Sequence, residues 1–287
     1  MSIAEELQMM SLGIKDVEDT RKDLNRFVEF MMAYEQPGQS QQDWTDSVGF
    51  MRSISYETLR RLKCFMMDPD IPDNDIPSDF HHESYGVFKN FYGNERNLYS
   101  GRFMIPVQDV YGNVMGFTGW CDDYILDNSP KYLDSINYGY KAKVCGFLGM
   151  QDLPRYYKDG YIVICEGPFC YMYMKDHNLP ALCSLGSSLS PTMVRIAERF
   201  EDKCLIIPDG TYLNSEGVLA IDDSGYKYRK QVHKLLPKAR VIQPKFAKDI
   251  DDTRKWLKEQ KEDGEEIIAE EIRRYLYEPF FEGEYFH

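Results

Sequence analysis

The chain has 287 residues, enough for one large domain or two smaller ones with a substantial hydrophobic core. Its 43% hydrophobic and 28% charged residues are ordinary for a soluble globular protein, and no run of about 18 apolar residues predicts a membrane span. The formal net charge of −13 disfavours a protein coated in positive surface, so any site for nucleic-acid phosphates must be local.

The cysteines and the N-terminus indicate a reducing compartment. The seven cysteines are odd in number, widely spaced and without a Cys-x-x-Cys pair, which argues against a disulfide framework and a zinc ribbon. The stretch "MSIAEELQMM" lacks the basic and apolar segments of a signal peptide. We therefore expect reduced thiols, a cytoplasmic location and no membrane partner.

The first half of the chain predicts helices followed by a hairpin. Residues 2–34 have a capping-box start and helical apolar spacing in "NRFVEFMMAY", and "EQPGQSQQ" has the composition of a linker. The segment "SISYETLRRLKCF" predicts a second helix that Ser55 starts. In "GRFMIPVQDVYGNVMGFTGW", two apolar runs joined by "DVYGN" are typical of a β-hairpin.

After "NSPKYLDS" the pattern changes to alternating strands and helices. Buried strands are expected in "GYIVICEG", "ALCSLGSS", "KCLIIPDG" and "RVIQPK", and helices in "FCYMYMKDHN" and "PTMVRIAERF". Short apolar strands that alternate with helices favour an α/β fold with a mostly parallel sheet covered on both faces. In such sheets the chemistry collects at the carboxyl ends of the strands.

Acidic residues follow three of these expected strands. Glu166 follows the first, Asp209 the third, and the segment "KDIDD" places Asp249, Asp251 and Asp252 after the fourth. Carboxylates at neighbouring strand ends can share a divalent cation, and such hard ligands favour Mg²⁺ or Mn²⁺. The alternative for each acid alone is a turn or helix-cap residue.

Two segments concentrate positive charge. Residues 226–245 contain no acid and include Lys227, Arg229 and Lys230, and a smaller cluster lies within residues 52–63. Each is either a solvated helix face or a contact for an anionic partner.

The order of these motifs resembles the TOPRIM domain shared by primases, topoisomerases and some nucleases. Upstream, "GRFMIPVQDVYGNVMGFTGW" followed by "SPKYLDS" is similar to a segment of bacterial, DnaG-like DNA primases, and "SISYETLRRLKCF" and "ALCSLGSSLS" also have counterparts there. The resemblance covers about residues 50 to 252 and implies an RNA polymerase core, with a small α+β N-terminal subdomain, a TOPRIM subdomain and template in the cleft between them. It divides the chain into a helical extension (1–45), the N-terminal subdomain (46–153), the TOPRIM subdomain (154–252) and a helical tail (253–287).

The resemblance also assigns roles. Glu166 resembles the TOPRIM glutamate, a metal ligand or general acid-base, and Asp209 the first metal-binding aspartate, while Asp249 and Asp251 resemble the later metal-binding pair. Basic positions that hold template or nucleotide triphosphate match Arg102 and Lys131, and a further one matches Lys141 or Lys143.

The sequence departs from the family pattern at several positions. The usual Asp-x-Asp after the third strand reads here as Asp209-Gly-Thr211; either Thr211 takes the second position, or an insertion separates Asp209 from "DDSGYK" and Asp222 or Asp223 folds back as the second ligand. We favour the insertion, because a basic helix follows as in the family. Other departures are Pro168, Cys170 and Trp120, and the family's zinc-binding module is absent, so no zinc is expected.

These observations predict a primase-like enzyme that makes short RNA primers on a single-stranded DNA template from ribonucleoside triphosphates, with Mg²⁺ or Mn²⁺. A separate zinc-module protein or a helicase is an expected partner, and a phage-encoded or accessory primase, acting in the host cytoplasm, fits the short chain. The alternatives are a degenerate TOPRIM protein that binds nucleic acid or a replication partner, and a TOPRIM nuclease. The stretch "YEPFFEGEYF" is expected to dock on a partner's groove or to fold back on the chain's own core.

Overall fold

The computed structural model describes residues 14–34, 48, 52, 54–67, 99, 101–121, 130–134, 136–137, 140–141, 146–209, 211–213, 219–221, 223–242, 250 and 264–277. The chain divides into two compact units: residues 1–49 with 59–142, and residues 50–58 with 143–287. The four-part division expected from the sequence stays a prediction. Within the described residues, no helix has the length and apolar character needed to cross a membrane.

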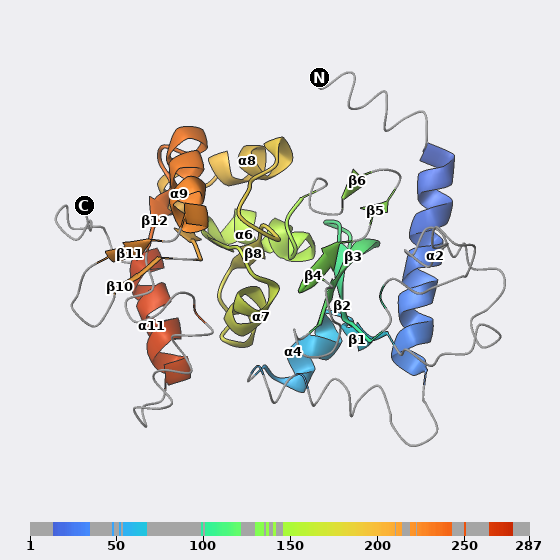
Figure 1. Cartoon of the computed structure of the whole chain (residues 1–287). Coiled ribbons are helices and arrows are strands. Elements are labelled where there is room, and N and C mark those ends of the chain that lie inside the picture. Colours follow the sequence, from blue (N-terminus) through green and yellow to red (C-terminus); the bar gives the residue numbers. More distant parts are fainter. Residues whose placement is uncertain are drawn as a thin grey trace. The chain divides into compact units, whose positions relative to one another are not determined.

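The first unit is built on an antiparallel sheet and one long helix, α2 (Ile14–Ala33). The sheet has the order β1-β2-β3-β4, and α2 packs along it (Figure 1). Its strands are β1 (Phe65–Met66), β2 (Phe103–Gln108), β3 (Val114–Trp120) and β4 (Tyr132–Asp134). A separate small ladder pairs β5 (Ile136–Asn137) with β6 (Tyr140–Lys141).

The apolar stripe of α2 supplies one side of this unit's core. Leu24, Phe27, Val28 and Met31 are fully buried, and their i, i+3, i+4, i+7 spacing places them on one helix face. The ring of Phe27 makes edge-on contacts with Phe65 and Phe117 of the sheet, at centroid distances of 6.1 and 6.2 Å. The expected helix within residues 2–34 is therefore confirmed for Ile14–Ala33, while residues 2–13 lie outside the described part.

The predicted hairpin is confirmed as β2 and β3. Two residues show why this segment forms it: Asp109 in the turn and Gly119 in β3. The Asp109 carboxylate accepts hydrogen bonds from the backbone N–H groups of Tyr111 and Asn113, both at 2.9 Å, which fixes the turn. Gly119 lies under Arg102: a Cβ at this glycine would stand 3.1 Å from the Arg102 side chain and 2.9 Å from Tyr99. The last glycine of the Gly-Phe-Thr-Gly segment thus leaves room for two large buried side chains.

The predicted second helix is α4 (Tyr56–Arg61). As expected, Ser55 starts it, because its Oγ accepts a hydrogen bond from the Thr58 backbone N–H at 3.2 Å. The helix ends earlier than the apolar pattern suggests, since Lys63 adopts a left-handed φ of 59° and the N–H of Cys64 bonds back to the Leu59 carbonyl at 3.0 Å. The chain then continues into β1.

The second unit contains a parallel sheet with the order β12-β9-β7-β8. Its strands are β7 (Ile162–Cys165), β8 (Ala181–Cys183), β9 (Cys204–Ile207) and β12 (Arg240–Val241). The helices are α6 (Leu153–Asp159), α7 (Pro168–Asp176), α8 (Pro191–Glu198), α9 (Asp223–Leu235) and α11 (Gly264–Tyr277), with short 3₁₀ turns η2 (Met150–Asp152) and η3 (Glu201–Lys203). The predicted α/β fold with a mostly parallel sheet is confirmed.

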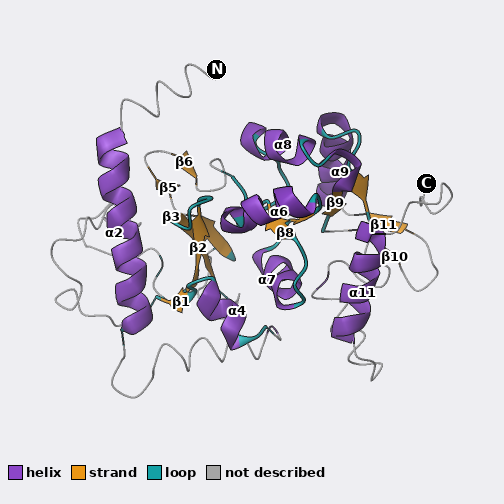
Figure 2. Cartoon of the chain, turned by 180° about the vertical axis from the view of Figure 1, so that it is seen from behind, coloured by secondary structure: helices purple, strands orange, loops and turns teal. Residues whose placement is uncertain are grey.

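The strand order places the helices on two faces. From β7 the chain moves to β8 on one side through α7, then back across β7 to β9 through α8, and on to β12 through α9. Because such crossovers are right-handed, α7 belongs to one face and α8 and α9 to the other. Figures 1 and 2 show this arrangement, with α11 on the face of α7. Both faces of the strands are covered, which explains why β7 and β9 are buried along their whole length.

Candidate active site at the carboxyl edge of the parallel sheet

β7 and β9 form the switch point of the parallel sheet. They are neighbours, with Cys165 paired to Ile207, yet the helices that follow them lie on opposite faces. In open α/β sheets, ligands bind in the crevice outside the strand ends at such a point. The first residues beyond these strands are therefore the ones best placed for chemistry.

Glu166 and Asp209 are those residues, and they lie in contact. The backbone N–H of Asp209 donates a hydrogen bond of 3.0 Å to the Glu166 carboxylate. Glu166 is 7% exposed and Asp209 is half-buried. The two acids, 43 residues apart in the sequence, thus share one position in the fold.

The turn after Glu166 explains the Glu-Gly-Pro sequence. Pro168 stands at the start of α7, where its missing N–H leaves no bond unmade. Gly167 exposes bare backbone towards the second acid: the Asp209 carboxylate oxygen Oδ2 lies 3.7 Å from where a Cβ on Gly167 would stand. The turn brings the Glu166 backbone, the helix start and Asp209 together.

Buried groups hold the Glu166 backbone in place from the side of β8. The N–H of Gly186 donates to the Glu166 carbonyl at 3.1 Å, and the Cys183 thiol donates to the same oxygen at 3.1 Å. The Ser184 hydroxyl donates to the Gly186 carbonyl at 2.7 Å. This network fixes the strand end that carries the acid.

Tyr228, which the sequence reasoning missed, is a buried neighbour of Glu166. It is fully buried on α9, and burial raises the pKa of its hydroxyl well above the ordinary range, with the nearby Glu166 carboxylate raising it further. Its phenol therefore stays neutral. The only sequence signal for it is its place on the helix that follows Asp209.

The thiols around the site are buried. Burial raises the pKa of Cys165 well above the usual thiol value, and the hydrogen bond with Cys183 raises it further. Cys170, at the position where the family carries an aspartate, is buried as well. Buried cysteines of this kind pack as small apolar groups.

The segment after Asp209 forms a hairpin that the sequence reasoning expected only as an insertion. β10 (Thr211–Leu213) pairs antiparallel with β11 (Leu219–Ile221), and Thr211 stands opposite Ile221. The hairpin therefore brings Ile221 back opposite Thr211, and α9 begins at Asp223. Whether Thr211 or one of Asp222 and Asp223 takes the second metal-binding position stays a prediction.

The other predicted metal ligands fall outside the described residues. This applies to Asp222, Asp249 and Asp251 and to the side chain of Asp223. Among the residues that the structure does describe, no group of three His, Cys, Asp or Glu is arranged to hold a metal ion. Glu166 and Asp209 are thus the two predicted ligands whose proximity is seen.

The predicted basic residues occupy different environments. In the first unit, Arg102 is fully buried and donates to the Gly119 carbonyl at 3.2 Å, whereas Lys131 is exposed at the start of β4. Lys141 belongs to β6, and its side chain lies outside the described part. Their predicted contacts with template or nucleotide stay predictions.

In the second unit, the cations of the acid-free segment follow α9. Lys227 and Lys230 are exposed, and partial burial lowers the pKa of the half-buried Arg229. Lys234, one turn further along, is exposed too, so three lysines form a stripe on one face of the helix.

Arg52 joins the site from the short basic cluster near residue 52. Its guanidinium lies 4.7 Å from the ring centre of Phe169, which belongs to the first turn of α7 directly after the Glu166 turn. A cation–π contact of this kind holds the charge close to the strand end. The sequence marked Arg52 as basic but gave no reason to place it against Phe169.

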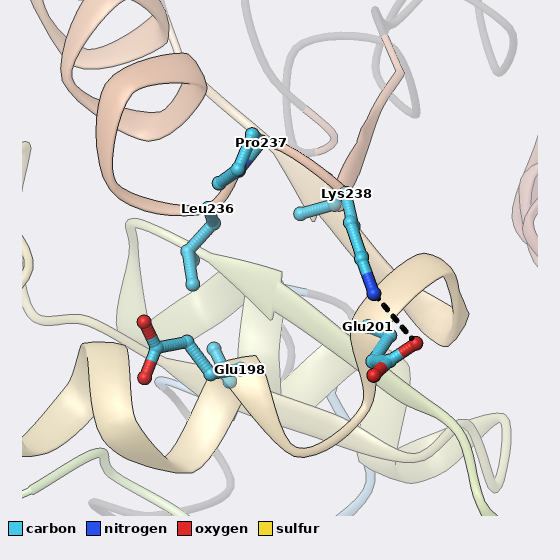
Figure 3. Close-up of a pocket in the computed structure, with 7 residues that line it drawn as sticks. Glu198, Glu201, Leu236, Pro237 and Lys238 are labelled. Carbon is cyan, nitrogen blue, oxygen red and sulfur yellow. Dashed lines mark hydrogen bonds and ion pairs between the residues drawn. The ribbon is translucent and has the colours of Figure 1, made fainter.

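A hollow of about 210 Å³ lies at the other end of the sheet (Figure 3). It is lined by Ala197, Glu198, Glu201, Leu236, Pro237, Lys238 and Ala239, where α8 and α9 end. An ion pair of 3.1 Å joins Lys238 to Glu201 at its rim. Because these residues precede β9 and β12, the hollow is separate from the acids, which follow the strands.

Comparison with curated proteins finds DNA primases. The chain is 26% identical to the DNA primase of Aquifex aeolicus over 209 residues, which cover 72% of this chain and 38% of that protein. It is 28% identical to the DNA primase of Buchnera aphidicola over 143 residues, 47% of this chain and 24% of that protein. The chain thus spans well under half the length of the curated relatives it matches. No protein-family model matches it.

Comparison with solved structures gives the same family of folds. The zinc-binding and RNA polymerase domains of the Aquifex aeolicus primase superpose with a TM-score of 0.68 at 22% identity, covering 90% of this chain and 60% of that one. The RNA polymerase domain of the Mycobacterium tuberculosis primase DnaG gives a TM-score of 0.63 at 16% identity, covering 90% and 83%. A DnaG primase catalytic domain bound to single-stranded DNA gives 0.62 at 16% identity, covering 89% and 78%. The homologues and structural neighbours of this chain are therefore DnaG-type DNA primases, and the chain has the fold of their catalytic core.

Proposed function

We propose that this chain is the catalytic core of a primase: a metal-dependent nucleotidyltransferase that joins ribonucleotides into short RNA primers on single-stranded DNA. The observation that carries the proposal is the contact between Glu166 and Asp209 at the switch point of the parallel sheet. The DNA primases among its relatives support the same activity. The sequence span that matches them includes the segments that resemble a primase rather than a TOPRIM nuclease.

The carboxylates of this edge suit a divalent cation. Glu166 and Asp209 offer hard oxygen donors side by side, and Asp249, Asp251 and Asp222 are the further ligands that we propose. This donor chemistry fits Mg²⁺ or Mn²⁺, because hard cations prefer carboxylate oxygens. When bound, such ions neutralise charge on the nucleotide's phosphates.

The remaining residues position the reactants. The buried network around the Glu166 backbone holds its carboxylate in one place, so that little reorganisation accompanies the reaction. Lys227, Arg229 and Lys230 on α9 are the proposed contacts for template phosphates, with Arg52 as a cation near the acids. Lys131 and Lys141 are proposed to hold template or the triphosphate, whereas Arg102 is fully buried against Gly119.

The proposed partners follow from this activity. They are a single-stranded DNA template, ribonucleoside triphosphates, and a helicase or a separate zinc-module protein for the choice of start site. The proposed location is the cytoplasm.

The test is primer synthesis with Glu166→Gln. The wild-type chain is incubated with single-stranded DNA, ribonucleotides and Mg²⁺ or Mn²⁺, and the RNA products are resolved on a denaturing gel. Glu166→Gln keeps the side-chain shape and removes the charge, so product formation should fall by at least about 100-fold. Glu198→Gln, at the opposite edge of the same sheet, is the matched control and should leave synthesis unchanged.

Two results would overturn the proposal. Metal-dependent cleavage of the DNA strand without RNA products would identify a nuclease. DNA binding without products, with either metal and with a zinc-module partner or helicase added, would identify a binding protein with a degenerate site.

A further inference from the structure

The end of α11 lies at the amino edge of the parallel sheet, close to the hollow of Figure 3. The ring of Tyr277, its last residue, packs edge-on against Tyr161 directly before β7, at a centroid distance of 5.2 Å. The Arg240 guanidinium, at the start of β12, donates to the Leu276 carbonyl at 3.5 Å. Two contacts thus fix the point where the chain leaves α11.

One residue that lines the hollow is the sequence neighbour of Arg240, which makes the second of these contacts. Ala239, which lines it, directly precedes Arg240, and Glu201 at its rim is two residues from Lys203. The ammonium of Lys203 lies 5.2 Å from the centre of the Tyr161 ring. The exit of α11 and the hollow therefore border on the same starts of β9 and β12.

The chemistry of the hollow suits an aromatic side chain. Leu236, Pro237, Ala197 and Ala239 supply apolar walls, and Lys238 stands at the rim (Figure 3). A cavity of about 150 Å³ is enough to take up benzene. Glu198 and Glu201 at the rim disfavour a carboxylate inside, so a ring rather than an acid is the expected occupant.

The ten residues after Tyr277 carry the complementary chemistry. Residues 278–287, "EPFFEGEYFH", contain four aromatic rings, three glutamates and no lysine or arginine. These residues lie outside the described part of the chain. An extended chain covers at most about 3.3 Å per residue, so Phe280 and Phe281 can extend up to about 10–13 Å from the exit point.

We propose that residues 278–287 dock against the amino edge of their own sheet, with the Phe280–Phe281 pair at the hollow of α8 and α9 and the glutamates facing Lys203, Lys238 and Arg240. A tethered segment of this kind has an effective concentration in the millimolar range, so weak contacts suffice to hold it. The docked segment covers the edge opposite Glu166 and Asp209. The proposal does not depend on the proposed activity.

Amide hydrogen exchange of the full chain tests this placement. Residues 280–284 should exchange at least tenfold more slowly than the same amides in a synthetic peptide of residues 278–287. Phe280→Ser with Phe281→Ser should abolish this protection and speed exchange at residues 238 and 239. Lys203→Glu should weaken it, whereas Lys227→Glu, the same charge change at the carboxyl edge of the sheet, should not.

A disulfide trap separates the chain's own segment from that of a second copy. Lys238→Cys combined with Phe281→Cys should form an intrachain disulfide under mild oxidation, identified by mass spectrometry of a monomer band; Lys227→Cys with Phe281→Cys should not. Unprotected amides in the wild-type chain, protection that survives the double phenylalanine change, or a disulfide found only between two chains would each overturn the proposal.

Discussion

At the scale of single residues, Glu166 has two roles that a substitution can separate. Its carboxylate accepts the N–H of Asp209 at 3.0 Å, which shapes the site, and its charge is the proposed source of metal binding. Glutamine preserves an oxygen acceptor at the same position, whereas alanine removes both acceptor and charge. The first role concerns stability and the second concerns activity.

Glu166→Ala should therefore destabilise the chain, while Glu166→Gln should not. The alanine leaves a partly buried N–H without its acceptor, at a cost of about 1–3 kcal/mol in the free energy of unfolding. Urea denaturation of the three proteins in parallel measures this difference. Equal stability of the alanine and glutamine variants would show that the hydrogen bond to Asp209 contributes nothing to folding.

Lys175 is a second buried charge, away from the site. Its ammonium, 4% exposed, donates to the Asp152 carboxylate at 2.7 Å and to the Tyr156 hydroxyl at 2.8 Å, which ties α7 to η2 and α6. Lys175→Met should lower the free energy of unfolding by about 2 kcal/mol, because Asp152 is only partly rehydrated. A double-mutant cycle with Asp152→Asn should show less than additive losses, and strict additivity would contradict a direct interaction.

At the scale of elements, the hairpin of β2 and β3 depends on one glycine for its packing. Gly119→Ala would place a methyl group 2.9 Å from Tyr99 and 3.1 Å from Arg102, both buried side chains. We expect a loss of about 1–3 kcal/mol in the free energy of unfolding, because a well-packed core accommodates an added methyl group only with strain. Thermal unfolding followed by circular dichroism measures it, and Gly112→Ala, in the exposed turn with open space around it but a φ of +81°, gives the separate cost of backbone strain.

The elements also show how far sequence patterns reach. The strands β7, β8 and β9 and the helices α7 and α8 were predictable, because buried runs, Pro191 and Ser190 mark them directly. The contact of Glu166 with Asp209 was predictable only from the general rule that functional residues gather at the carboxyl ends of parallel strands. The proximity of Tyr228 to Glu166 and of Arg52 to Phe169 was not predicted, because it depends on how α9 and the segment before α4 pack, which no local pattern contains.

At the scale of the whole molecule, the second unit separates two kinds of chemistry at the two edges of one sheet. The acids and the turn of α7 lie at the carboxyl edge, and the hollow and the end of α11 lie at the amino edge. The strand order produces this separation, since every helix between parallel strands must return the chain from one edge to the other. One parallel sheet can therefore carry a site at each of its two edges without an additional domain.

Buried thiols and phenols in both units predict how stability depends on pH. Burial raises the pKa of Cys204 to about 12 and raises the pKa values of Cys64, Cys165 and Tyr228 as well. The folded chain keeps these protons where the unfolded chain releases them, so this stability is fully present below the ordinary thiol value and declines as the pH rises above about 9. The free energy of unfolding should therefore fall between pH 8 and pH 9.5, and Cys204→Val should make that slope shallower. A flat profile over this interval would contradict the buried, neutral state of the thiols.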